Sequence, residues 1–70
     1  MNSDNTALAI GAAIRDARRA AGMTQQQLAA ATGLPQPNIS AYERGAKFAG
    51  VETLRRIGAA LGADYKSLLP

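Results

Sequence analysis

Apolar residues recur at spacings of three and four along most of the chain, a period typical of amphipathic helices. The first such series runs from Leu8 to Ala21, and the charged residues of this stretch occupy mostly the other helix faces. The last long series runs from Val51 to Leu61. Ala accounts for sixteen residues and aromatic residues for only 4% of the chain, which favours closely packed helices over a sheet. The pattern therefore predicts an all-α fold.

Glycines divide this pattern into five predicted helices, because a glycine after the last turn can take the left-handed conformation that ends a helix. The glycines at the predicted ends of the first four helices are Gly22, Gly33, Gly45 and Gly62. Asp64 is placed to cap a last short turn, which carries Tyr65, Leu68 and Leu69.

The polar residues 1–6 are expected to form a flexible N-terminal arm, with Thr6 as a possible cap of the first helix. Residues 7–70 contain no internal repeat and no low-complexity linker. The sequence therefore predicts a single folded domain over residues 7–70.

The second predicted helix has the clearest start signal in the chain. Thr24 and Gln27 have the spacing of a capping box, in which the hydroxyl accepts from one backbone N–H and the amide returns a bond. Pro37 suits the first position of the third helix, where no N–H is needed, and Gln36 before it is expected to be extended.

Two short helices joined by a turn around a glycine suggest a helix-turn-helix over about residues 24–44. Such a unit needs a small residue where the helices cross, a left-handed turn residue, and two large buried residues on the second helix. Ala29, Gly33, Ile39 and Tyr42 fill these four positions at the required spacings.

The stretches MTQQQLA (residues 23–29) and ISAYERG (residues 39–45) are the most specific part of a family resemblance. Over about residues 8–69, the chain resembles the phage-repressor/Cro (XRE) family of helix-turn-helix proteins. The resemblance implies a compact five-helix lambda-repressor-like domain that binds double-stranded DNA. It further implies a transcriptional regulator that acts as a homodimer on a pseudo-palindromic operator, and a repressor rather than an activator.

The same resemblance implies a set of DNA-binding residues, with the third helix as the recognition helix. These residues are Gln25, Gln36, Pro37, Asn38, Ser40, Ala41, Arg44 and Lys47. The amides of Gln36 and Asn38 can donate to and accept from adenine, and Arg44 and Lys47 suit phosphates. The alternative is that Gln25, Gln36 and Asn38 serve only as cap or first-turn residues.

Other positions have structural or partner roles in this interpretation. The resemblance implies an ion pair between Arg18 and Glu43, joining the first helix to the end of the third. We expect a dimer interface at the apolar residues Phe48, Tyr65, Leu68 and Leu69. Phe48 also has the alternative of covering the core.

Composition narrows the function further. The 70 residues include Cys 0 and His 0, which excludes disulfides and removes the usual zinc ligands and general base. We therefore expect no metal, no cofactor and no enzymatic activity. Eight Lys+Arg against five Asp+Glu give a net charge of +3, which agrees with an anionic partner.

The sequence also argues against a membrane partner. No apolar run approaches the roughly 20 residues that span a bilayer, and residues 1–6 lack the basic region of a signal peptide. We expect a cytoplasmic protein that associates with the nucleoid when it is bound to its operator.

Two alternative functions use the same fold. An antitoxin would bind a protein toxin and autoregulate its operon, but toxin binding usually needs a further segment, for which residues 1–6 leave little room. An interaction module without DNA binding would carry acidic or bulky residues on the groove-facing positions, and Gln36, Asn38 and Ala41 are neither.

Overall fold

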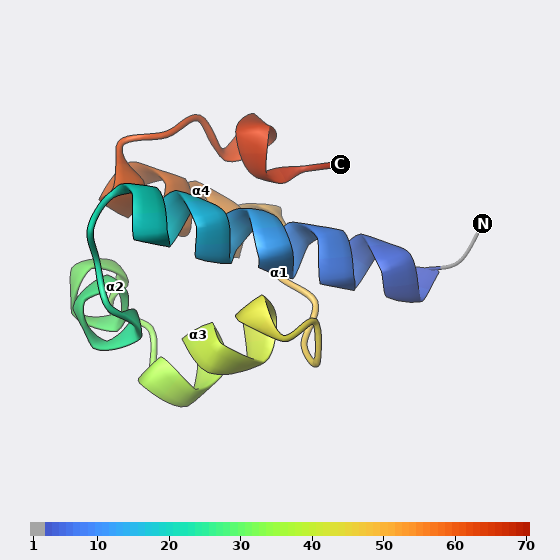
Figure 1. Ribbon diagram of the computed structural model, residues 1–70, viewed down its shortest axis with the longest axis horizontal. Helices are drawn as coiled ribbons and strands as arrows, with labels where there is room; N and C mark the ends of the chain where they lie inside the picture. Colours follow the sequence, from blue (N-terminus) through green and yellow to red (C-terminus); the bar gives the residue numbers. More distant parts are fainter. Residues whose placement is uncertain (1–2) are drawn as a thin grey trace.

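The computed structural model describes residues 3–70, which form four α-helices and a 3-10 helix (Figure 1). The elements are α1 (Ser3–Ala20), α2 (Gln25–Thr32), α3 (Gln36–Glu43), α4 (Val51–Leu61) and η1 (Tyr65–Leu68). The all-α prediction is confirmed, and no strand occurs within residues 3–70. The prediction of five α-helices is wrong in its last member, because the turn after Asp64 is a single 3-10 turn.

The start of α1 differs from the prediction. Residues 3–6, expected in a flexible arm, are helical, so Thr6 lies inside α1 and does not cap it. Residues 1–2 of the predicted arm lie outside the described residues. Residues 3–6 contain neither Gly nor Pro, and extending an existing helix adds one hydrogen bond for each residue fixed.

The start of α2 confirms the predicted capping box. The Thr24 hydroxyl accepts from the Gln27 N–H at 3.1 Å, and the Thr24 N–H donates to the Gln27 side chain at 2.8 Å. Two of the N–H groups that the first turn leaves unpaired are thereby satisfied.

The start of α3 lies one residue earlier than predicted. Pro35 is extended, and its carbonyl accepts from the N–H groups of Asn38 and Ile39 at 3.0 and 3.2 Å. Gln36 is therefore helical rather than extended, and Pro37 takes the second position rather than the first. These hydrogen bonds outweigh the bias of a pre-proline residue against helix, and Pro37 lacks only an N–H that the first turn would leave unpaired.

The predicted cap of the last short turn is confirmed. Asp64 accepts from the Lys66 N–H at 3.0 Å and caps η1. At α4, Gly50 occupies the N-cap position and provides no side-chain hydrogen bond.

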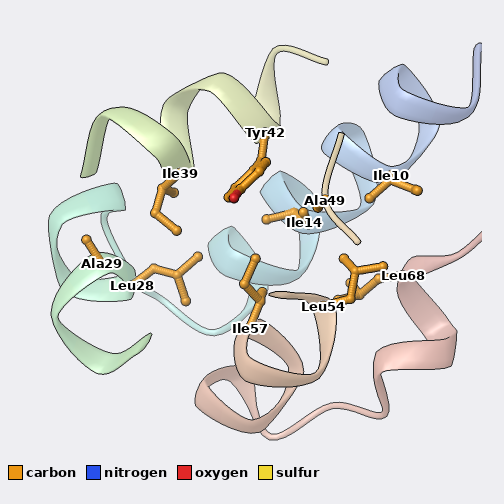
Figure 2. Packing of buried hydrophobic residues seen from close by; sticks show 10 residues of the cluster. All are labelled: Ile10, Ile14, Leu28, Ala29, Ile39, Tyr42, Ala49, Leu54, Ile57 and Leu68. Carbon is orange, nitrogen blue, oxygen red and sulfur yellow. The ribbon is translucent and has the colours of Figure 1, made fainter. Parts of the chain in front are cut away.

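The core draws on every element. Its buried apolar members are Ile10, Ile14, Leu28, Ala29, Ile39, Tyr42, Ala49, Leu54, Ile57 and Leu68 (Figure 2). The long helix α1 packs against α3, α4 and η1, while α2 packs against α3 and α4. In Figure 1, α1 crosses the molecule with α2 and α3 on one side and η1 on the other. This arrangement holds α2 and α3 together at one side of the domain.

One glycine fixes the distance between α1 and α3. A Cβ at Gly11 would collide with the backbone carbonyl oxygens of Tyr42 and Glu43, the latter at 2.8 Å. The absence of a side chain at Gly11 therefore lets α1 lie directly against the end of α3.

Within residues 3–70, no helix is long and apolar enough to cross a membrane.

Candidate nucleic-acid interface

The structure places α2 and α3 as the sequence predicts for a helix-turn-helix. Gly33 ends α2 in the left-handed conformation, with φ 74°, so that the chain turns sharply towards α3. Ala29 is buried at the contact between the helices, and Ile39 and Tyr42 hold α3 on the core. The four steric requirements are therefore met by the predicted residues.

The remaining side of α3 is open to solvent. Gln36 and Pro37 are exposed in the first turn, and Asn38, Ser40 and Ala41 are half-buried. The buried residues of α3 are Ile39, Tyr42 and Glu43, so its only acidic side chain points away from solvent. The groove-facing residues named from the sequence thus lie on an accessible, uncharged helix surface.

Two basic side chains flank this surface at the other end of α3. Arg44 is exposed, and its Nε donates to the Ser40 hydroxyl at 3.4 Å. Lys47 is also exposed, with its ammonium nitrogen 5.9 Å from the centroid of the Tyr42 ring. Both cations remain accessible to an anion from solvent.

The predicted ion pair between Arg18 and Glu43 is present and buried. Arg18 Nε and Nη2 donate to the two carboxylate oxygens at 2.6 and 3.0 Å, and Nη1 donates to the Met23 carbonyl at 2.9 Å. Burial acts to raise the pKa of Glu43, but hydrogen bonds from Arg18 and Gln25 outweigh it and hold that pKa below its usual value. Donation of these hydrogen bonds to Glu43 raises the pKa of Arg18. The pair therefore stays ionised at neutral pH.

The ion pair continues into the first turns of both helices of the motif. Gln25 Nε2 donates to Glu43 Oε1 at 3.1 Å, and Gln36 Nε2 donates to Gln25 Oε1 at 3.2 Å. These contacts join Arg18, Glu43, Gln25 and Gln36 into what we call the amide relay. The sequence reasoning missed the relay, although a long amide at the first position of each of the two helices was a visible signal.

The residues expected at a dimer interface fall into two groups. Phe48 and Leu69 are 60% and 41% exposed, so Phe48 does not cover the core. Leu68 is only 2% exposed and belongs to the core of the single chain, which makes its assignment to an interface wrong. Tyr65 is half-buried against the core, and the Arg55 guanidinium lies 4.9 Å from its ring centroid.

Two further apolar side chains are exposed that the sequence reasoning did not assign to a surface. Leu8 on α1 is 54% exposed, and Val51 at the start of α4 is 52% exposed. Both belong to the apolar series of their helices, and periodicity alone does not indicate which members of a series lie at its edge.

Together, the fold and the open face of α3 define a helix-turn-helix domain. A family model described as a helix-turn-helix domain matches residues 9–68, and the chain belongs to this family. The regulators among its structural neighbours are XRE-like, so the resemblance seen in the sequence is confirmed. No curated protein matches the sequence.

Several solved structures are similar to this one. ClgR, the clp gene regulator of Corynebacterium glutamicum, is 35% identical with a TM-score of 0.85, and the match covers 89% of this chain and 80% of that one. The restriction-modification controller protein C.AhdI of Aeromonas hydrophila is 25% identical with a TM-score of 0.86, covering 90% and 96%. HppE, described in complex with substrate, is 25% identical with a TM-score of 0.82, but the match covers only 37% of its chain against 91% of this one. The fold therefore also occurs as one part of a longer chain.

Proposed function

We propose that this protein is a sequence-specific DNA-binding transcription regulator that places α3 in the major groove. The observation that carries the proposal is the open, uncharged surface of α3, with two exposed cations just after the C-terminal end of the helix. A helix presented in this way can enter the major groove, where each base pair shows a distinct pattern of donors and acceptors. The helix-turn-helix family and the similar regulators support the same function.

Base recognition is proposed for the N-terminal half of α3. Gln36 carries an exposed amide that can pair with N6 and N7 of adenine, and Asn38 carries a second, half-buried amide in the same turn. Ala41 and Pro37 offer apolar surface that suits a thymine methyl group and the shape of the groove. The first turn of α3, together with Ala41 in the second turn, therefore supplies the sequence preference.

Backbone contacts are proposed at both ends of the surface. Arg44 and Lys47 are placed to neutralise phosphates, with Ser40 beside Arg44 as a neutral donor. The start of α2 at Gln25 carries the positive end of the helix dipole, which suits a further phosphate.

The test begins with selection of bound sequences from random duplexes, followed by comparison of three proteins. Gln36→Ala should weaken binding to the selected duplex by about tenfold while changing affinity for random DNA little, because it removes a proposed base contact and no proposed phosphate contact. Lys47→Ala should weaken binding to both duplexes similarly. The slope of log affinity against log salt concentration should fall by about the contribution of one neutralised phosphate. Equal losses on selected and random DNA for Gln36→Ala would contradict its role in base recognition.

We further propose that the protein acts as a homodimer on a pseudo-palindromic operator and represses transcription by blocking the promoter. Phe48 and Leu69 support this proposal as exposed apolar side chains outside the α3 surface. A two-fold dimer would place its recognition helices about 34 Å apart, so that selected duplexes should carry inverted half-sites one helical turn apart. We expect Leu69→Asp to convert the dimer into a monomer, which sedimentation measures. The same variant should lose repression of a reporter gene fused to the promoter. An unchanged dimer would exclude Leu69 from the interface.

A further inference from the structure

The turn between α2 and α3 consists of residues 33–35, and two of these are restricted by the covalent structure of the chain. Pro35 has its φ fixed by its ring and stands at −62°. Leu34 precedes this proline, which disfavours helical conformations for it. The third residue, Gly33, has the largest conformational freedom of any residue type. The rotations about Gly33 therefore decide how firmly α3 is oriented relative to α2.

Hydrogen bonds hold the peptide groups on both sides of Gly33. The Gly33 N–H donates to the Ala29 carbonyl at 2.9 Å. The Leu34 N–H, in the next peptide group, donates to the Thr32 hydroxyl oxygen at 3.2 Å. That hydroxyl donates its own proton to the Leu28 carbonyl at 2.8 Å and lies 3.2 Å from the Ala29 carbonyl. Thr32 is thus bonded both to the last turn of α2 and to the residue beyond Gly33, and we call these contacts the Thr32 bridge.

The surroundings of the Thr32 bridge favour it. Thr32 is only 7% exposed, so little water competes for its hydroxyl, and Leu34 packs half-buried against the core. The Leu34 N–H has no other hydrogen-bond acceptor within residues 3–70. Removal of the hydroxyl would therefore leave a half-buried N–H unpaired and free the rotation about ψ of Gly33.

The first turn of α3 depends on this bridge because the core holds that turn weakly. The buried residues of α3 begin at Ile39, whereas Gln36 and Pro37 are exposed and Asn38 is half-buried. The hydrogen bond between Gln36 and Gln25 is exposed, so water competes for it. The end of α3 that carries the proposed base contacts is therefore oriented mainly by the preceding turn.

We propose that Thr32 is a positioning residue, whose hydroxyl holds the first turn of α3 in its DNA-binding orientation in the free protein. The inference rests on the proposed DNA-binding function and adds to it a buried residue that lies away from the open face of α3. An orientation already fixed in the free protein removes the entropic cost of ordering the turn on binding. A neutral hydrogen bond contributes a factor of about fivefold to such an equilibrium.

Three variants separate the hydroxyl from the rest of the side chain. Thr32→Val keeps the shape and removes the hydroxyl, and Thr32→Ser keeps the hydroxyl and removes the methyl group. Thr53→Val is the matched control on α4, at a half-buried threonine whose hydroxyl makes no hydrogen bond within the described chain. At a temperature where all variants are folded, Thr32→Val should bind the selected duplex about fivefold more weakly. Thr32→Ser and Thr53→Val should bind it like the natural chain.

A purely structural role of the hydroxyl predicts a different result. A hydroxyl that only stabilises the fold lowers the Tm of Thr32→Val and leaves the affinity of the folded protein unchanged. In the positioning role, the affinity for random DNA and its salt dependence stay unchanged, because Arg44 and Lys47 lie at the other end of α3. A folded Thr32→Val protein with the natural affinity for the selected duplex overturns the proposal, and so does an equal loss on random DNA.

The bridge is also measured without DNA, which separates its failure from failure of the proposed function. In the natural chain, the Leu34 amide should be protected from hydrogen exchange, and this protection should be lost in Thr32→Val and kept in Thr32→Ser. NMR relaxation should show a more mobile backbone over residues 33–38 in Thr32→Val alone. If no duplex is preferred but the amides respond in this way, the DNA-binding function fails and the bridge stands. An unprotected Leu34 amide in the natural chain overturns the proposal, even if Thr32→Val does not fold.

Discussion

Gly11 is the residue on which the approach of α1 to α3 depends. Its missing side chain leaves room for the carbonyl oxygens of Tyr42 and Glu43, which are backbone atoms and cannot move aside like a flexible side chain. The same contact sets the position of the Glu43 backbone relative to Arg18 on α1.

We therefore expect Gly11→Ala to destabilise the fold by about 2 kcal/mol or more, because overpacking outweighs the gain of about 1 kcal/mol in helix propensity. Urea unfolding measures the change. Gly50→Ala is the matched control, since nothing lies within 4 Å of the added Cβ and φ is −75°, and it should change stability by less than about 1 kcal/mol. Equal effects of the two substitutions would contradict the close approach at Gly11.

Among the elements, α2 depends most on its first turn, because it is only eight residues long. Thr24→Ala removes the hydroxyl that accepts from the Gln27 N–H, and we expect a loss of about 1 kcal/mol in the free energy of unfolding. Thr24→Ser keeps the oxygen and should retain most of the stability. If the Ala and Ser variants are equally stable, the capping hydrogen bond contributes nothing measurable.

A capping hydrogen bond can be added at α4, because its N-cap is Gly50, which makes no side-chain hydrogen bond. Its φ of −75° and ψ of 175° suit a capping serine, and the added Cβ meets no atom within 4 Å. Since glycine is already a tolerated cap, Gly50→Ser should stabilise the domain by a few tenths of a kcal/mol. Thermal melting would show a small rise in Tm, and a fall would mean that the hydroxyl does not reach the first turn.

Element ends were predictable where one residue type is required by backbone geometry. Gly33 shows this, because its φ of 74° suits glycine and a sequence can therefore mark the end of α2. The start of α3 was misplaced by one residue because the carbonyl of Pro35 collects two hydrogen bonds that local preferences do not reveal. Leu68 was assigned to a surface because a single 3-10 turn has too little periodicity to show which of two adjacent leucines is buried.

The candidate site was likewise predicted only in part from the sequence. The exposed positions on α3 followed from the family resemblance, and their accessibility is found in the structure. The contact between Gln25 and Gln36 could not follow from spacing, because it joins two helix starts that only the packed motif brings within 3.2 Å. The sequence shows the two glutamines, but only the packed motif shows that their side chains meet.

For the whole molecule, the buried ion pair ties stability to pH. Burial acts to raise the pKa of Glu43, but hydrogen bonds from Arg18 and Gln25 lower it below its usual value. A carboxyl with a lowered pKa stabilises the fold above its ordinary pKa of about 4.3 and loses this contribution as pH falls through its value in the folded protein.

We therefore expect the free energy of unfolding of the natural chain to fall between about pH 5 and about pH 3. The Arg18→Met and Glu43→Gln double variant should fall less over this range, because it has no buried carboxylate to protonate. Asp16→Asn, which removes an exposed carboxylate and leaves the pair intact, should keep most of the acid sensitivity. Urea unfolding at both pH values measures the difference, and parallel losses in all three proteins would exclude the pair as the source.

The amide relay also bears on how such a domain could acquire new target sequences during evolution. Asn38 and Ala41 make no side-chain hydrogen bond within the described chain, so either can be exchanged alone without breaking one. Gln36 is coupled to Gln25 and through it to the interior, so a productive exchange there needs a second substitution to accompany it. Divergence among descendants of this domain should therefore begin at Asn38 and Ala41 and reach Gln36 late, in paired steps.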